Sequence, residues 1–114
     1  MEALLKNLVE SFGPTGTEDQ VRAQIRSEVE TLSDEVHVDA LGNLIALKRG
    51  KGEKRIILAA HMDEIGIISK YIDEDGFVRF TFIGGVSPLS CVGSRVLFAN
   101  GTVGVIFFNE EEKD

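Results

Sequence analysis

His61 and Asp63 are the two residues of this 114-residue chain whose types and spacing could do chemistry. They follow residues 55–60, whose last five residues are all apolar, as expected of a buried strand. Side chains along a strand alternate between two faces, so a histidine and a carboxylate two positions apart would point to the same side. An imidazole held by a carboxylate is typical of a metal ligand with its orienting partner. The pattern therefore predicts a metal site at the end of a strand.

The pattern alone leaves a second interpretation of His61 open, that of a buried histidine bonded to backbone. A zinc site also needs about three or four ligands, and only one good ligand is present here. The other histidine, His37, lies on the polar phase of its predicted strand and is expected to be exposed. Cys91 has no histidine near it in sequence and is expected to be a small packing residue.

The elements that must position these residues are two helices followed by strands. Apolar residues at helical spacing predict a helix over 4–12 that Gly13-Pro14 stops, and Thr17 with Gln20 forms a capping-box pattern before a second helix. Two hairpin turns are expected at Asp75-Gly76 and Asn100-Gly101. The predicted strands are 35–39, 44–47, 55–60, 65–72, 77–83, 96–99 and 102–108. The order of elements indicates the α/β class.

Composition excludes several functions. With 12 basic and 19 acidic residues the net charge is −7, which argues against nucleic-acid binding. A single cysteine excludes an internal disulfide and is typical of a reducing compartment, and neither a signal peptide nor a membrane span is evident. We therefore expect a cytoplasmic protein without nucleic-acid or membrane partners. The charged tail, residues 110–114, is expected to be disordered.

Four segments in the same order resemble the N-terminal part of the glutamyl, deblocking and tetrahedral aminopeptidases, whose relatives are also labelled endoglucanase M or cellulase M. These are two-metal peptidases. The resemblance extends to about Phe107 and corresponds to roughly the first third of such an enzyme. The segments that carry it are Ser11–Glu18, Val38–Ala46, Ala59–Gly66 and Gly76–Gly85.

The resemblance implies the start of a zinc-peptidase-like (phosphorylase/hydrolase-like) catalytic domain over 1–68 and part of a β-rich dimerisation domain over 69–109. It implies that His61 is a ligand of one of two metal ions, zinc or cobalt. Asp63 is then the catalytic-site carboxylate that orients it. The family's other ligands and its general-base glutamate fall in motifs that this sequence does not contain. The expected activity is removal of N-terminal residues from peptides in the complete enzyme, with the present chain inactive alone and a homo-oligomer as the assembled form.

Two alternatives follow. The chain could be a non-catalytic module that pairs through an exposed β edge, residues 103–108, with itself or with a longer paralogue. It could also be a glycan hydrolase, as the family's older label suggests. That chemistry needs two carboxylates facing one site without a metal, whereas His61 and Asp63 favour a metal.

Overall fold

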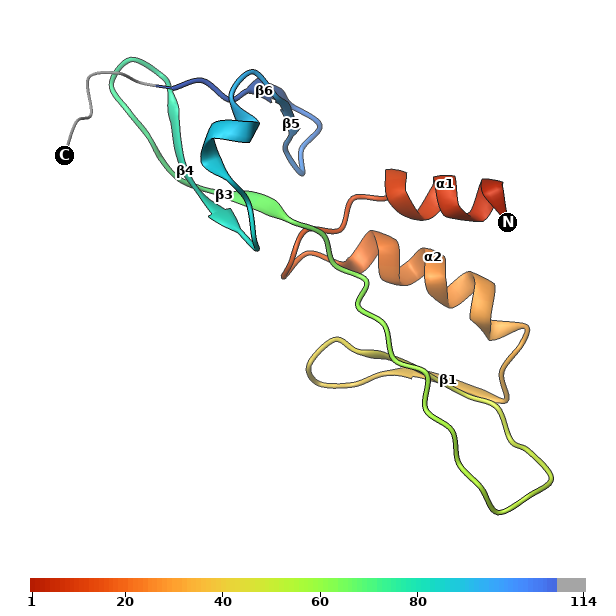
Figure 1. Cartoon of the computed structure of the whole chain (residues 1–114). Coiled ribbons are helices and arrows are strands. Elements are labelled where there is room, and N and C mark those ends of the chain that lie inside the picture. Colours follow the sequence, from red (N-terminus) through yellow and green to blue (C-terminus); the bar gives the residue numbers. More distant parts are fainter. Residues whose placement is uncertain (109–114) are drawn as a thin grey trace. The chain divides into compact units, whose positions relative to one another are not determined.

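A computed structural model describes residues 1–108 and divides into two compact units, Met1–Glu64 and a second that begins at Ile65 (Figure 1). Helices and strands are mixed, which confirms the predicted α/β class. The assignment of 1–68 and 69–109 to a catalytic and a dimerisation domain stays a prediction. The acidic tail, 110–114, lies outside the described residues. Within the described part, no helix has the length and apolar character needed to cross a membrane.

The first unit consists of two helices and one hairpin: α1 (Glu2–Glu10), α2 (Asp19–Glu30), β1 (Glu35–Val38) and β2 (Leu44–Leu47). Helix α1 ends at Ser11, whose backbone is extended and whose hydroxyl donates to the Asn7 carbonyl at 2.7 Å. Strands β1 and β2 are antiparallel, with Val38 opposite Leu44. The predicted helices and the predicted hairpin at 35–47 are therefore present.

The predicted capping box before α2 is wrong. The Thr17 hydroxyl donates to the Pro14 carbonyl at 3.0 Å, so it closes the turn that precedes the helix. The N-cap residue is Glu18, and its side chain accepts the Gly16 N–H at 2.6 Å and makes no cap hydrogen bond to the N–H groups of the helix start. The local turn therefore takes the hydroxyl that the helix end would otherwise use.

Asp39 organises the turn between β1 and β2. Its carboxylate accepts the N–H groups of Leu41 and Asn43, each at 2.9 Å, and the Asn43 side-chain amide at 2.8 Å. The Asn43 amide and N–H groups hold the pKa of Asp39 below its usual value. Gly42 adopts φ +88°, and its carbonyl accepts Arg22 Nε at 2.9 Å. Helix α2 is thereby tied to the hairpin.

The second unit consists of two hairpins joined through a short 3-10 helix: β3 (Gly66–Ile72), β4 (Val78–Ile83), η1 (Pro88–Cys91), β5 (Arg95–Leu97) and β6 (Val103–Val105). Both predicted hairpins form, although β5 and β6 are shorter than expected. Their turns contain Gly76 at φ +87° and Gly101 at φ +85°, a backbone region that glycine enters without strain. The Phe77 and Phe107 rings pack with their centroids 5.0 Å apart.

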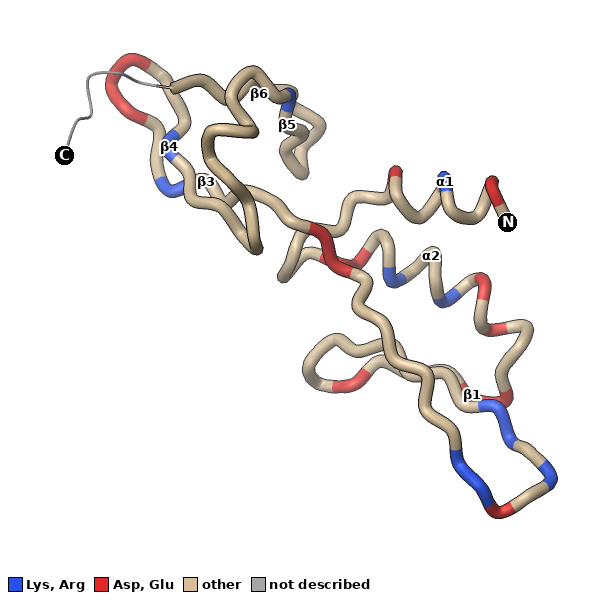
Figure 2. Tube along the Cα trace, in the orientation of Figure 1, with Lys and Arg blue, Asp and Glu red and all other residues tan. Residues whose placement is uncertain are grey.

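The predicted buried strand at 55–60 is wrong. This segment is neither helix nor strand, and Ile56, Ile57 and Leu58 are 87%, 88% and 94% exposed. Apolar residues in a row favour a buried strand, but a strand also requires a neighbouring strand to pair with. The described residues provide no such neighbour for 55–60. The loop before the segment, together with the segment's first residue, carries a cluster of basic residues, shown in blue in Figure 2: Lys48, Arg49, Lys51, Lys54 and Arg55.

Candidate functional site

His61 and Asp63 lie together, as their spacing predicts. The Nδ1 atom of His61 is 3.1 Å from Asp63 Oδ1 and 3.0 Å from the Asp63 carbonyl oxygen. Both oxygens are acceptors, so Nδ1 must carry the hydrogen. In the neutral ring the lone pair is then on Nε2, and the His61 side chain is 87% exposed. The imidazole therefore presents its coordinating nitrogen to solvent, as a metal ligand with an orienting carboxylate does.

Asp63 is held in turn by Thr15. The Thr15 hydroxyl donates to Asp63 Oδ2 at 2.7 Å, so the two carboxylate oxygens bond to different partners. The Thr15 hydroxyl and the His61 ring together hold the pKa of Asp63 below its usual value. The carboxylate is therefore ionised at neutral pH and fixed in direction.

The loop after α1 pairs with the segment that bears the site. Glu64 N–H donates to the Gly13 carbonyl at 2.9 Å, and Thr15 N–H donates to the Glu64 carbonyl at 3.4 Å. Pro14 and Glu64 form a parallel β-bridge, and Glu64 Oε1 accepts the Gly13 N–H at 3.3 Å. This pairing brings Thr15 within reach of Asp63, across 48 positions of sequence.

Gly13 permits that pairing because no side chain fits at its position. An added Cβ would lie 2.7 Å from Cγ1 of Val21, which is 5% exposed and faces the loop from α2. Val21 and Ile106 are the two buried apolar side chains in the described part of the chain, one in each unit. Among the described residues of the first unit, the buried apolar side chain thus packs against Gly13, in the loop that pairs with Glu64.

The described residues provide one metal ligand, His61, and the carboxylate that orients it, but not a complete metal site. Within residues 1–108, no group of three or more His, Cys, Asp and Glu side chains is arranged to hold a metal ion. His37 is exposed on β1, opposite Ile45, as predicted. Cys91 is half-buried at the end of η1, in the second unit. The donor chemistry of His61 with Asp63 suits a divalent metal, but a full ligand set requires other residues.

Sequence reasoning missed Thr15 and Gly13 as residues that support the site. Thr15 lies in a segment that carries only the family resemblance, and Gly13 was predicted only to end the first helix. No periodicity relates them to Asp63 or Glu64, because the contact joins positions about fifty residues apart. The single local signal was the helix stop at Gly13-Pro14, which predicted a turn and gave no partner for it.

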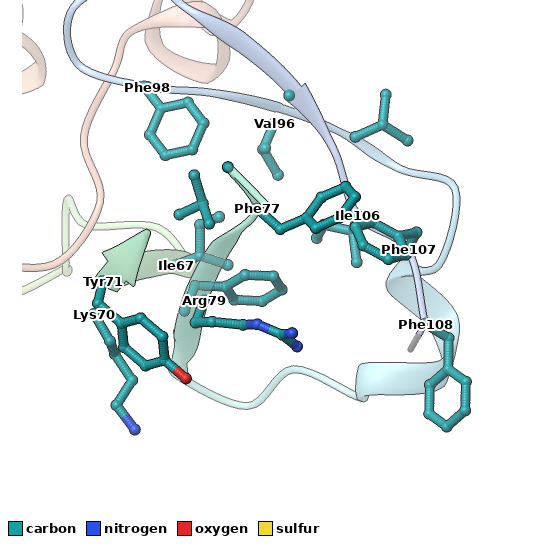
Figure 3. Close-up of a pocket in the computed structure, with 15 residues that line it drawn as sticks. Ile67, Lys70, Tyr71, Phe77, Arg79, Val96, Phe98, Ile106, Phe107 and Phe108 are labelled. Carbon is teal, nitrogen blue, oxygen red and sulfur yellow. The ribbon is translucent and has the colours of Figure 1, made fainter. Parts of the chain in front are cut away.

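A separate cavity of about 590 Å³ lies within the second unit (Figure 3). Aromatic and aliphatic side chains from both hairpins line most of it, among them Ile67, Phe77, Phe98 and Phe107. Lys70 and Arg79 add two cations at its wall. Neither histidine of the chain lines this cavity, so it offers no metal ligand of that kind.

Known aminopeptidases match most of this chain in sequence. The M42 glutamyl aminopeptidase family model matches residues 42–111. An aminopeptidase candidate of Acetivibrio thermocellus is 50% identical over 111 residues, which cover 97% of this chain and 33% of the relative. The chain therefore spans about a third of the length of the curated relatives it matches.

Solved structures agree with the sequence match. A Thermotoga maritima protein described as an endoglucanase has a TM-score of 0.82 and 42% identity, covering 92% of this chain and 34% of that protein. A protein described as a PhTET1-12s dodecamer has a TM-score of 0.81 and 35% identity, covering 100% of this chain and 36% of that protein. Sequence and fold both confirm the resemblance, and the chain belongs to the M42 glutamyl aminopeptidase family.

Proposed function

We propose that this chain contributes His61 as one metal ligand, and Asp63 as its orienting residue, to a two-metal aminopeptidase centre. The complete enzyme removes N-terminal residues from peptides, and its metal ions are zinc or cobalt. The observation that carries the proposal is the contact of His61 Nδ1 with Asp63, which directs Nε2 outward as a coordinating nitrogen. Family membership supports the same reaction class.

The residues of the chain have distinct tasks in this proposal. When bound, the two metal ions activate water and polarise the scissile carbonyl. Asp63 keeps the hydrogen of His61 on Nδ1 and fixes the orientation of the ring. Thr15 keeps the Asp63 carboxylate in position through its 2.7 Å bond. The Glu64–Gly13 pairing fixes the backbone on which both residues lie.

The remaining ligands and the general base must come from other residues, because the described part of the chain gathers no group of three or more His, Cys, Asp and Glu side chains that could hold a metal ion. A water-activating carboxylate is needed to take the proton from the attacking water. Glu64 is not assigned that role, since its carboxylate accepts the Gly13 N–H. We therefore propose that this polypeptide alone has no aminopeptidase activity.

A glycan-hydrolase function is less well supported, despite the endoglucanase description of one structural relative. Two carboxylates would have to face a sugar from opposite sides of one bond. Asp63 bonds to Thr15 and His61, whereas Glu64 bonds to Gly13, so both carboxylates are committed to protein contacts.

Homo-oligomeric assembly is part of the proposal, supported by the dodecameric relative. A cytoplasmic location is proposed from the single cysteine.

Zinc titration of the chain, followed by NMR, tests the ligand. We expect weak binding that perturbs the His61 ring and disappears in His61→Ala. His37→Ala is the matched control, since it removes the other exposed histidine, and should leave zinc binding unchanged. Equal loss of zinc binding in His61→Ala and His37→Ala would show that His61 is not a specific zinc ligand.

Thr15 tests the orienting role of Asp63. Thr15→Val removes the hydroxyl at constant shape, and we expect weaker zinc binding than in the parent chain. Thr15→Ser retains the hydroxyl donor and should bind zinc as the parent chain does.

Amino-acyl anilide hydrolysis by the purified chain should be absent, and chelator-sensitive turnover would contradict the proposed inactivity.

A further inference from the structure

Pro14–Thr17 is a tight turn that carries Thr15, the residue whose hydroxyl holds Asp63. The Thr17 N–H donates to the Pro14 carbonyl at 2.8 Å, and Gly16 adopts φ +89°. A hydrogen bond between the first and fourth residues, with a positive φ at the third position only, is the geometry of a type II turn. Thr15 therefore occupies the second position of such a turn, and the turn determines where its side chain begins.

Glu18 bonds to the central peptide of this turn. Its Oε1 atom accepts the Gly16 N–H at 2.6 Å, and that N–H belongs to the peptide bond between Thr15 and Gly16. Turns of type I and type II differ mainly in the direction of this central peptide. A carboxylate bound to its N–H opposes a reversal, because a charge-assisted hydrogen bond is roughly twice as strong as a neutral one. Glu18 therefore stabilises the type II form of the turn that carries Thr15.

Arg22 holds the other oxygen of Glu18. Its Nη2 atom lies 3.5 Å from Glu18 Oε2, and its Nε donates to the Gly42 carbonyl at 2.9 Å. The side chains of Arg22 and Glu18 are 17% and 22% exposed, so solvent ions screen this pair only in part. Gly42 belongs to the turn between β1 and β2, which anchors the guanidinium. The Glu18 carboxylate can therefore leave the Gly16 N–H only by also moving away from a fixed cation.

We propose that Glu18 and Arg22 are positioning residues for the metal ligand, because they fix the turn from which Thr15 acts. The contacts form one continuous series that ends at the ligand: Arg22, Glu18, the peptide after Thr15, Asp63 and His61. The inference rests on the proposed function, in which His61 binds a metal ion. A series of contacts transmits an effect only if its members are energetically coupled, so the test is a measurement of coupling.

The His61 ring reports the positioning effect without any metal ion. Nitrogen NMR, at a fixed pH at which the ring is neutral, measures the fraction of rings with the hydrogen on Nδ1, the form that Asp63 selects. We expect Glu18→Ala to lower this fraction in the same direction as Thr15→Val, and by no more. Asp19→Ala is the matched control, since it removes a carboxylate of the same helical turn that contacts Arg22 Nη1 at 2.5 Å. It should leave the fraction unchanged.

A double variant tests whether Glu18 acts through Thr15. If it does, Glu18→Ala should lower the Nδ1–H fraction no further in a Thr15→Val background. Additive effects of the two substitutions would mean that Glu18 acts by another route, which would overturn the proposal. Arg22→Met should change the fraction as Glu18→Ala does. Arg26→Met is its control, because it removes an exposed ion pair with Glu30 on the same helix and should have no effect.

Zinc titration connects the positioning effect to metal binding. Residues that orient a metal-binding histidine typically change metal affinity by about tenfold to a hundredfold. Glu18 acts at a greater distance from the metal ion, so Glu18→Ala should weaken zinc binding by about twofold to tenfold. Asp19→Ala should bind zinc as the parent chain does. Circular dichroism of each variant shows that the comparison is made between folded chains.

The two possible failures are distinguishable. Absence of zinc binding in the parent chain would contradict the proposed function. A parent-like His61 ring in Glu18→Ala would contradict the positioning role, whether or not zinc binds. Should Glu18→Ala not fold, Glu18→Gln provides the same test, because it keeps an oxygen for the Gly16 N–H and loses the charge that pairs with Arg22. It should lower the Nδ1–H fraction, and an unchanged ring would overturn the proposal.

Discussion

Gly13→Ala should destabilise the first unit through one identifiable contact. The new Cβ would lie 2.7 Å from Cγ1 and 3.3 Å from Cβ of Val21. Val21 is buried in a helix, where a β-branched side chain has one strongly preferred rotamer, so its methyl group cannot rotate away cheaply. Overpacking of this kind costs about 1–3 kcal/mol of unfolding free energy. The perturbation should also move the Gly13 carbonyl that accepts the Glu64 N–H.

Val21→Ala provides the test of cause. Alone it should cost about 1–2 kcal/mol, since two methyl groups leave a buried position. It also removes the atom at 2.7 Å and leaves the Val21 Cβ at 3.3 Å and the Met62 carbonyl oxygen at 3.8 Å, so Gly13→Ala should cost little in this background. A double-mutant cycle should then give a coupling of about 1–2 kcal/mol.

Urea unfolding followed by far-ultraviolet circular dichroism is the assay, because both described α-helices, α1 and α2, lie in the first unit. Gly52→Ala is the control: an added Cβ there meets nothing within 4 Å, so its stability should be unchanged or slightly raised. Additive costs for Gly13→Ala and Val21→Ala, within about 0.5 kcal/mol, would refute the reasoning.

Three further outcomes are expected. Gly42→Ala should cost about 1–2 kcal/mol in urea unfolding because its φ is +88°, whereas Gly50→Ala, in open space and without a positive φ, should cost nothing. Asp39→Ala should destabilise the chain at neutral pH: the amide and N–H groups of its turn hold the folded pKa of Asp39 below the unfolded one. That contribution is complete above the unfolded pKa of about 3.9 and disappears as pH falls through the folded pKa. The unfolding free energies of the parent chain and of Asp39→Ala, measured against pH, should therefore converge in acid. Phe77→Leu should cost about 1 kcal/mol in the second unit through its lost ring contact with Phe107, measured by intrinsic tyrosine fluorescence during unfolding; an unchanged midpoint would contradict it.

Local sequence signals predicted the elements whose stability is local. The helices follow from apolar residues at helical spacing, and the hairpin turns from Asp75-Gly76 and Asn100-Gly101, whose glycines adopt positive φ. The candidate site was predicted in part, because His61 and Asp63 are two positions apart and their contact depends on little else.

The errors have two physical causes. The Thr17 hydroxyl had two competing partners within its reach, the Pro14 carbonyl as an acceptor and a backbone N–H of the helix start as a donor, and the sequence does not rank them. The run at 55–60 predicted a buried strand, but the segment is exposed and unpaired, because strand formation depends on a partner at another position. The same limit applies to Thr15, whose bond to Asp63 joins residues 48 positions apart. Contacts between distant positions are not visible in the periodicity of a single sequence.

The Glu64–Gly13 pairing has a consequence for the order of folding. It closes a loop of 51 positions, so its entropic cost must be met before the bond contributes anything. Helices α1 and α2 can form while the chain is still being synthesised, because their bonds are local. The His61–Asp63 pair reaches its supported position only after residue 64 has left the ribosome and returned to the start of the chain. Support of the Asp63 carboxylate by Thr15 is therefore one of the last events in the folding of the first unit.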